Sequence, residues 1–191
     1  MQYAITFDYL CPFARNANEG VTAGLREGRD WDVTFQAFSL SQVHLSEGET
    51  PVWEDDEPAS GVLALAWGIA VRDAFPERFL DVHDALFAAR HDHGLDINDE
   101  SVLRDVAGSA GLDPDEVADA VASGRPLKAL GAEHTAGVDD HAVFGVPTFI
   151  VGDEAVFVRL MTRGDVAAID RILEQMSWTD LNEFKRTRVP R

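Results

Sequence analysis

The only cysteine of this chain lies in residues 7–14, which read Phe7-Asp8-Tyr9-Leu10-Cys11-Pro12-Phe13-Ala14. A strand-like segment precedes this stretch, and apolar residues at helical spacing follow it until Gly28. Because Pro12 suits the first turn of a helix, the pattern places the Cys11 thiol at a helix N-terminus. The positive end of the helix dipole favours the thiolate, so we expect Cys11 to be a reactive nucleophile.

No second cysteine accompanies the first. In a Cys-x-x-Cys redox motif the second sulfur would stand at the position that Ala14 occupies here. A mixed disulfide on Cys11 would therefore need an external thiol for its release, which predicts a monothiol cycle. Asp8 would disfavour the thiolate and make the sulfur less acidic than in strong oxidants. The alternative interpretation is a small, buried, unreactive cysteine.

Composition excludes several classes of function. The chain has 191 residues, 46% of them hydrophobic, which fits one domain or one domain with a large insertion. Its formal net charge of −18 disfavours a nucleic-acid partner. No apolar run is long enough to cross a membrane, and the first residues enter a strand-like pattern that leaves no room for a signal peptide. With a single cysteine and no internal disulfide, we expect a cytoplasmic protein without a membrane partner.

The chain divides into three blocks. Residues 1–58 show a strand, a helix and a second strand at 31–38, followed by a polar, acidic loop from residue 44 to 60. Residues 59–142 are helical throughout. Residues 143–191 hold two strands, joined by a Gly152-Asp153 turn, and a last helix that Thr162 can cap.

Five helices are predicted in the middle block. Pro76 separates the first two, the third begins near Asn98, and Asp113 caps the fourth. A fifth helix is expected from residue 126 to 142, interrupted or weakened at Gly131 and Gly137.

Several of these segments together carry a resemblance to a known family. The chain resembles the thioredoxin fold and its DsbA-like branch, and within that branch the actinobacterial group that includes the mycothiol-dependent nitroreductase, and more distantly the FrnE-like proteins. The segments that support it are Cys11-Pro12, Phe38-Ser39-Leu40, Ala66-Trp67-Gly68, His91 before Gly94, His134, Gly145-Val146-Pro147-Thr148 and the tail Phe184-Lys185-Arg186-Thr187-Arg188. The resemblance implies an α/β thioredoxin fold, β-α-β then β-β-α, with an all-helical DsbA-like insertion.

The resemblance also implies roles for individual residues. Pro147 would be cis and would bring the backbone of Val146 beside the active-site sulfur, where it can pair with a bound thiol; Thr148 opens the strand that follows. His134 matches a family position and could stabilise a thiolate or donate a proton, although an imidazole on a surface helix is the alternative. Ala14 departs from the family pattern, in which relatives carry a second cysteine.

Two aromatic residues leave alternatives open. Phe13 could flank a bound thiol or pack against the insertion. Trp67 could line a substrate pocket, but it shares an apolar stripe with Leu63 and Ala70 and so favours the core.

Other polar groups favour simpler interpretations. His83 lies on an apolar stripe and is interpreted as a hydrogen-bonded interior histidine. His91, Asp92 and His93 lack further ligands at a recognisable spacing, so no metal site is expected. The basic run at residues 185–188 is typical of a solvated tail, although it could also dock against the acidic surface.

These observations predict a thiol-disulfide oxidoreductase without a tightly bound cofactor. Cys11 would be the nucleophile, Pro12 would set the helix entry, His134 would assist, and the thiol would be bound by residues that surround the sulfur: Phe13, Ala14, Trp67, Val146, Pro147 and Thr148. The cosubstrate would be a low-molecular-weight thiol, mycothiol or glutathione, and the substrate a disulfide or another small reducible molecule.

Three further hypotheses stay open at this point. The first is an enzyme similar to the kappa-class glutathione transferases and 2-hydroxychromene-2-carboxylate isomerases, which bind a thiol cofactor without reducing a substrate. The second is a non-enzymatic thioredoxin-fold binding module. The third concerns assembly, because an exposed Cys11 could link two subunits into a homodimer.

Overall fold

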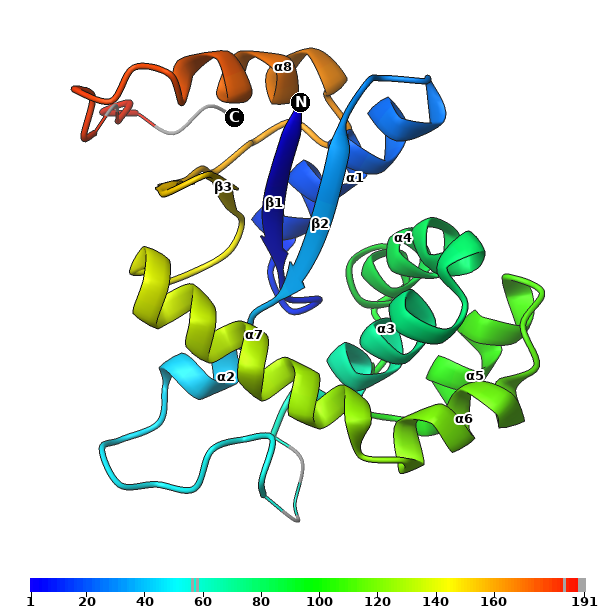
Figure 1. Ribbon diagram of the computed structural model, residues 1–191. Helices are drawn as coiled ribbons and strands as arrows, with labels where there is room; N and C mark the ends of the chain where they lie inside the picture. The colour runs from blue at the N-terminus through cyan, green and yellow to red at the C-terminus, as the bar shows by residue number, and fades with distance from the viewer. Residues whose placement is uncertain (56, 58, 184, 189–191) are drawn as a thin grey trace.

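A four-stranded mixed sheet forms the centre of the protein (Figure 1). The computed structural model describes residues 1–55, 57, 59–183 and 185–188, so that Phe184 of the tail segment lies outside the described residues. The strands are β1 (Gln2–Phe7), β2 (Asp32–Ala37), β3 (Thr148–Val151) and β4 (Glu154–Phe157). Their order is β2-β1-β3-β4, with β1 and β2 parallel and the other two pairs antiparallel.

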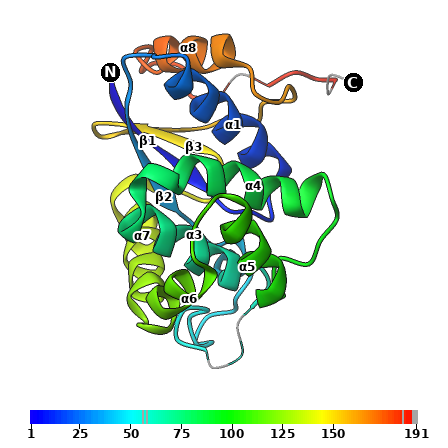
Figure 2. The ribbon, with the colours of Figure 1, turned by 90° about the vertical axis from the view of Figure 1, so that its right-hand side faces the viewer.

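Helices and strands follow one another in the predicted order. Helix α1 (Pro12–Arg26) connects β1 to β2, the short α2 (Leu40–Val43) follows β2, and α8 (Val166–Gln175) follows β4. Helix α1 lies against β1 and packs on α8 (Figures 1 and 2). The arrangement β-α-β, helical insertion, β-β-α confirms the predicted α/β thioredoxin fold.

The insertion is built around one apolar helix. It contains α3 (Val62–Ala74), a 3₁₀ turn (Pro76–Arg78), α4 (Phe79–His91), α5 (Glu100–Ser109), α6 (Pro114–Ala122) and α7 (Arg125–His141). Helix α3 contacts all four of the longer helices that follow it, and most of its residues are buried. A helix that is apolar on all sides must be shielded from water, and these neighbouring helices provide the shielding.

Helix α7 is continuous, which contradicts the predicted interruption at Gly131 and Gly137. A Cβ atom at position 131 would lie 2.7 Å from Nε1 of Trp53. The glycine therefore permits close packing of the loop that carries Trp53, and it does so without ending the helix. At position 137 a Cβ atom would meet Nε2 of Gln36 at 3.1 Å, again a close approach.

The cap of the last helix was also predicted wrongly. Asp165, rather than Thr162, is the N-cap of α8, and its carboxylate accepts a hydrogen bond from the Ala168 backbone N–H at 3.0 Å. Thr162 lies in the turn before the helix, three residues too early to reach the free backbone N–H groups of the first turn. The predicted cap Asp113 of α6 is confirmed by a hydrogen bond from the Asp115 backbone N–H, and Asp99 caps α5, next to the predicted start near Asn98.

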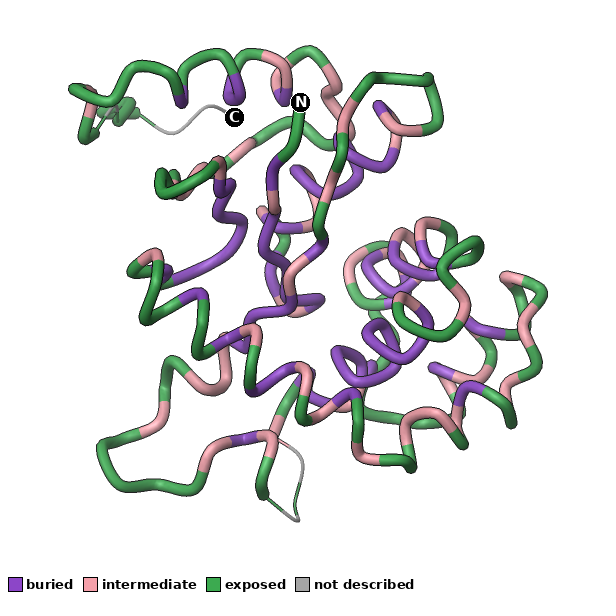
Figure 3. The backbone as a smooth tube through the Cα atoms, in the orientation of Figure 1, coloured by how far each residue is buried: buried purple, intermediate pink, exposed green. Residues whose placement is uncertain are grey.

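Buried residues run continuously from the sheet into the insertion (Figure 3). Ile5 and Phe149, paired across β1 and β3, and Leu65 on α3 belong to the same core and are all inaccessible to solvent. In the part of the chain that the structure describes, no helix has the length and apolar character that crossing a membrane requires.

One contact of this shared core is especially tight. Gly68 on α3 faces Tyr9, and a Cβ atom there would lie 2.3 Å from the Tyr9 hydroxyl oxygen. We expect Gly68→Ala to lower the free energy of unfolding by about 1–3 kcal/mol because the core would be overpacked. Urea unfolding measures the change.

Gly108→Ala on α5 is the matched control. Its added methyl group would find only Pro114, at an ordinary contact distance of 3.6 Å. Since alanine favours a helix over glycine, this variant should gain up to about 1 kcal/mol. An equal effect of the two substitutions would contradict the close approach of Tyr9 to α3.

Candidate functional site

Cys11 is the N-cap of helix α1, and Pro12 is its first residue. The sulfur accepts a hydrogen bond from the Ala14 backbone N–H at 3.4 Å. The thiol in turn donates to the backbone oxygen of Val146, also at 3.4 Å. The peptide bond between Val146 and Pro147 is cis. The fold thus joins the two motifs that the sequence singled out, although they are 135 residues apart.

The electrostatics of Cys11 differ from the expectation. Burial raises the pKa of the thiol, the N–H groups of Ala14 and Phe13 lower it, Asp8 raises it and Arg159 lowers it, with a net rise. The side chain is only 8% exposed, so loss of water outweighs the helix N-terminus. The predicted preference for the thiolate is therefore wrong for the resting protein, which holds a protonated thiol at neutral pH.

Asp8 organises the loops around the sulfur. It is 1% exposed, and its two carboxylate oxygens accept hydrogen bonds from the backbone N–H groups of Leu10, at 2.8 Å, and Leu40, at 2.7 Å. Burial raises its pKa to about 6, despite both hydrogen bonds. At neutral pH Asp8 is thus mostly a carboxylate that ties the turn after β1 to the turn after β2.

The cis-proline loop is anchored on both sides. The Thr148 backbone N–H donates to the Thr6 hydroxyl at 2.8 Å, and the Thr148 hydroxyl donates to the Gly145 oxygen at 2.8 Å. On the other side, the Val158 backbone N–H donates to the Pro147 oxygen at 3.1 Å. These bonds hold the Val146 oxygen in place opposite Cys11.

Two histidines of α4 hold the loop that leads to Cys11. The Tyr9 hydroxyl lies 2.9 Å from Nδ1 of His83, and Nε2 of His83 lies 3.1 Å from the Asn18 side-chain oxygen. Nε2 of His91 donates to the Tyr9 backbone oxygen at 2.9 Å. Burial lowers the pKa of His83 to about 3, which confirms a neutral, hydrogen-bonded interior histidine. Sequence reasoning did not reveal that both histidines position Tyr9, because their partners come from α1 and the β1–α1 loop.

His134 packs against the turn that follows β2. It is buried rather than on the surface, its Nδ1 accepts a hydrogen bond from the Ser39 backbone N–H at 3.2 Å, and its ring stacks on Phe38 at 4.2 Å between centroids. Burial lowers its pKa to about 4. These contacts tie α7 to the segment that follows β2, and the role expected for His134 at the sulfur stays a prediction.

The two aromatic candidates differ in position. Trp67 is 2% exposed and belongs to the core around α3. Phe13 is half-buried in the first turn of α1, with the guanidinium carbon of Arg159 5.3 Å from its ring centroid. Arg159 was not identified from the sequence, where nothing distinguishes it from other surface arginines.

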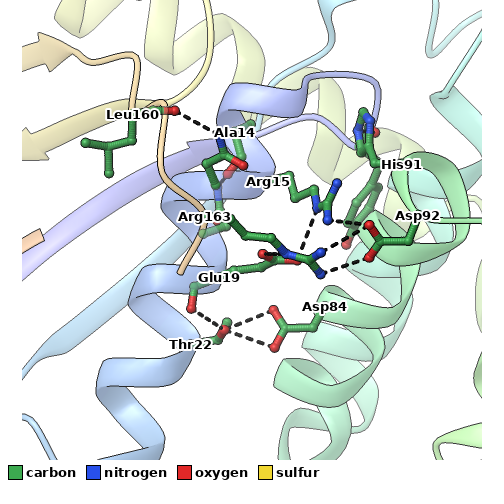
Figure 4. A network of polar contacts seen from close by, with 12 residues as sticks. Ala14, Arg15, Glu19, Thr22, Asp84, His91, Asp92, Leu160 and Arg163 are labelled. Atoms are coloured by element: carbon green, nitrogen blue, oxygen red, sulfur yellow. Dashed lines mark hydrogen bonds and ion pairs between the residues drawn. The ribbon is translucent and has the colours of Figure 1, made fainter. Parts of the chain in front are cut away.

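Beside the site, a cluster of ion pairs joins three segments (Figure 4). Arg15 of α1 and Arg163 of the loop before α8 both pair with Glu19 and with Asp92, which follows α4. The cluster fixes the first turns of α1 against the insertion and the C-terminal loop. Within the described ranges, no three metal-ligating side chains are grouped closely enough to hold an ion.

Comparison with known proteins agrees with this geometry. The profile of the DSBA-like thioredoxin domain matches residues 70–165, half of the chain, and the chain belongs to this family. Among solved structures it is similar to a 2-hydroxychromene-2-carboxylate isomerase, with a TM-score of 0.67 at 18% identity, covering 94% of this chain and 98% of the other.

Two oxidoreductases show the same fold. The cytosolic disulfide reductase DsbM from Pseudomonas aeruginosa, solved with GSH, has a TM-score of 0.65 at 16% identity and covers 93% of this chain and 100% of its own. DsbA from Xylella fastidiosa has a TM-score of 0.62 at 17% identity, with 94% and 86% covered. At these identities the likeness concerns the fold. A sequence search of curated proteins found no match.

The state of the thiol can be measured directly, because Cys11 is the only cysteine. We expect the rate of alkylation by iodoacetamide to rise with pH around a midpoint above the ordinary thiol value of about 8.5. The urea-unfolded chain is the control and should show the ordinary midpoint. A midpoint below that of the unfolded chain would mean that the helix N-terminus outweighs burial after all.

Proposed function

We propose that this protein is a thiol-disulfide oxidoreductase in which Cys11 is a single nucleophile and a low-molecular-weight thiol is the cosubstrate. The observation that carries this proposal is the contact between the Cys11 sulfur and the Val146 oxygen at the cis Val146–Pro147 bond. This arrangement leaves a backbone edge beside the nucleophile, where the peptide-like part of a thiol can pair. Family membership supports the same class of activity.

The proposed cycle balances without an internal second cysteine. The Cys11 thiolate attacks one sulfur of a disulfide, the S–S bond breaks, and the other sulfur leaves as a thiolate that takes a proton from solvent. A thiolate from solution then attacks the mixed disulfide, which releases Cys11 and forms a new disulfide. One sulfur of the original disulfide is thereby reduced to a thiol, and the external thiol takes its place in the new disulfide.

The residues around Cys11 would support the cycle by positioning the sulfur and the bound thiol. Pro12 starts the helix that carries the sulfur, the N–H of Ala14 stabilises the thiolate once it forms, and Val146 to Thr148 supply the backbone edge. Phe13, two residues after Cys11 and in contact with Arg159, would flank the bound thiol. The cycle as written requires no group from His134 or Trp67, both of which are buried.

The proposal also names the cosubstrate, the substrate and the location of the protein. The thiol would be glutathione or mycothiol, the substrate a small disulfide or another reducible molecule, and the location the cytoplasm. The cytosolic DsbM, solved with GSH, supports a small thiol as the partner.

A second candidate is an isomerase or transferase that binds its thiol cofactor without forming a disulfide. Two observations favour it: burial keeps the resting Cys11 protonated, and the fold is similar to that of the 2-hydroxychromene-2-carboxylate isomerase. In such an enzyme the Cys11 thiol would only donate or accept hydrogen bonds.

Intact-mass measurement separates the two candidates. After incubation with oxidised glutathione we expect an adduct of one glutathione on the protein, absent in Cys11→Ser, and a loss of disulfide-reducing turnover in that variant because the nucleophile is gone. Binding of glutathione without an adduct would support the isomerase. A Cys11→Ser variant with full disulfide-reducing turnover would overturn the assignment of Cys11 as the nucleophile, and inertness toward all alkylating reagents would support a binding module.

The Ala14→Cys substitution tests the monothiol geometry. Because the Ala14 backbone N–H already contacts the Cys11 sulfur, we expect the new thiol to form an internal disulfide with Cys11, seen as the loss of two hydrogens by mass spectrometry. The variant should then release a bound thiol without a second external one. Ala17→Cys, one turn further along α1 and equally buried, is the control and should not form the bond.

A further inference from the structure

Arg159 is held beside the reactive sulfur by aromatic rings. Its guanidinium carbon lies 5.3 Å from the ring centroid of Phe13, two residues after Cys11, and 5.7 Å from that of Phe157 on β4. An arginine over aromatic faces keeps its planar N–H donors free at the edge. The charged group is thus held close to the first turn of α1 without using its hydrogen-bond donors.

The backbone on both sides of Arg159 is anchored. The preceding residue, Val158, donates its N–H to the oxygen of Pro147 at 3.1 Å. The following residue, Leu160, accepts a hydrogen bond from the Asn16 side chain of α1 at 2.8 Å. Arg159 therefore stands between the cis-proline loop and the helix that carries Cys11, the two segments that define the site.

No carboxylate among the described residues pairs with the Arg159 charge. Arg15 and Arg163 are both paired with Glu19 and Asp92 (Figure 4), whereas Arg159 makes no ion pair or hydrogen bond with the residues that the structure describes. An exposed and unpaired cation next to the nucleophile is notable in a chain with a formal charge of −18. Its effect reaches the sulfur, because Arg159 lowers the pKa of Cys11.

Apolar surface continues from this cation. Phe144 is 67% exposed and packs against Phe157, with 5.0 Å between ring centroids. A ligand lying along this side of the site would meet a guanidinium first and an aromatic surface beyond it.

We propose that Arg159 binds a carboxylate of the small thiol or disulfide that reacts at Cys11, so that the substrates of this site are anionic thiols and their disulfides. A guanidinium forms paired, charge-assisted hydrogen bonds with a carboxylate, which a neutral ligand cannot offer. This inference rests on the proposed function and narrows its cosubstrate. Glutathione carries carboxylates, whereas mycothiol, a sugar conjugate, carries none, so glutathione or a similar acidic thiol is the better match.

Two alkylating reagents of nearly equal size test the proposal. Iodoacetate carries a carboxylate and iodoacetamide does not, and Cys11 is the only thiol that can react. We expect Arg159→Gln to lower the ratio of the iodoacetate rate to the iodoacetamide rate by about two- to fivefold, the range of an exposed ion pair. A change in the thiol pKa affects both rates alike, so the ratio reports on recognition of the anion.

Matched variants exclude a general charge effect. Arg125→Gln removes the same charge from the exposed start of α7 on the insertion and should leave the ratio unchanged. Arg159→Lys keeps the charge but not the planar fork and should give an intermediate ratio. The proposal is overturned if the ratio is unaffected in Arg159→Gln, or if it falls equally in Arg125→Gln.

Disulfides complete the test with the proposed chemistry. We expect the wild-type protein to form its adduct faster with oxidised glutathione than with the neutral bis(2-hydroxyethyl) disulfide, and Arg159→Gln to lose that preference. If both disulfides react and the preference does not depend on Arg159, the inference fails while the proposed function stands. If neither disulfide forms an adduct, the proposed function fails, and the substrate assignment fails with it.

Discussion

The contact between the Cys11 sulfur and the Val146 oxygen is the constraint on which the rest of the site depends. It joins the N-terminal and C-terminal parts of the thioredoxin fold, which the helical insertion separates in sequence. Each side is held by buried polar bonds, from Asp8 to the turns after β1 and β2 and from Thr148 to β1. A buried polar group without a hydrogen-bond partner costs free energy. These bonds therefore hold the loops firmly in place.

The insertion contributes to the site without supplying a reacting group. Through His83 and His91, helix α4 holds Tyr9 from both its hydroxyl and its backbone, and α3 leaves room for that ring at Gly68. The helix that carries Cys11 is further tied to the insertion by the ion pairs of Arg15 with Asp92. The position of the nucleophile is therefore set by the thioredoxin core and the insertion together.

Opposing electrostatic effects meet at the sulfur. Backbone N–H groups at the start of α1 and the Arg159 charge favour the thiolate, whereas burial and Asp8 favour the thiol, and burial is the largest effect. The resting thiol becomes a thiolate only when a ligand or a rise in pH shifts this balance. We expect such a thiol to react slowly and selectively. Arg15 and Arg163 are already paired, whereas Arg159 makes no ion pair with the residues that the structure describes, so its donors can serve such a ligand.

Hydrophobic periodicity, proline and capping residues determined the element order, the helix start at Pro12, the cap Asp113, and the identity of Cys11 as the candidate nucleophile, because these are properties of neighbouring residues. Local patterns were less informative where two segments meet. Gly131 predicts a weakened helix, but it permits the close packing of Trp53, and Asp165 provides the cap that the sequence assigned to Thr162. Only the tertiary structure decided that burial outweighs the backbone N–H groups at Cys11, that His134 bonds the turn after β2, and that Arg159 lies between Phe13 and Phe157. Desolvation and the pairing of charges depend on which distant segments pack together, and that information is not contained in the spacing of residues along the chain.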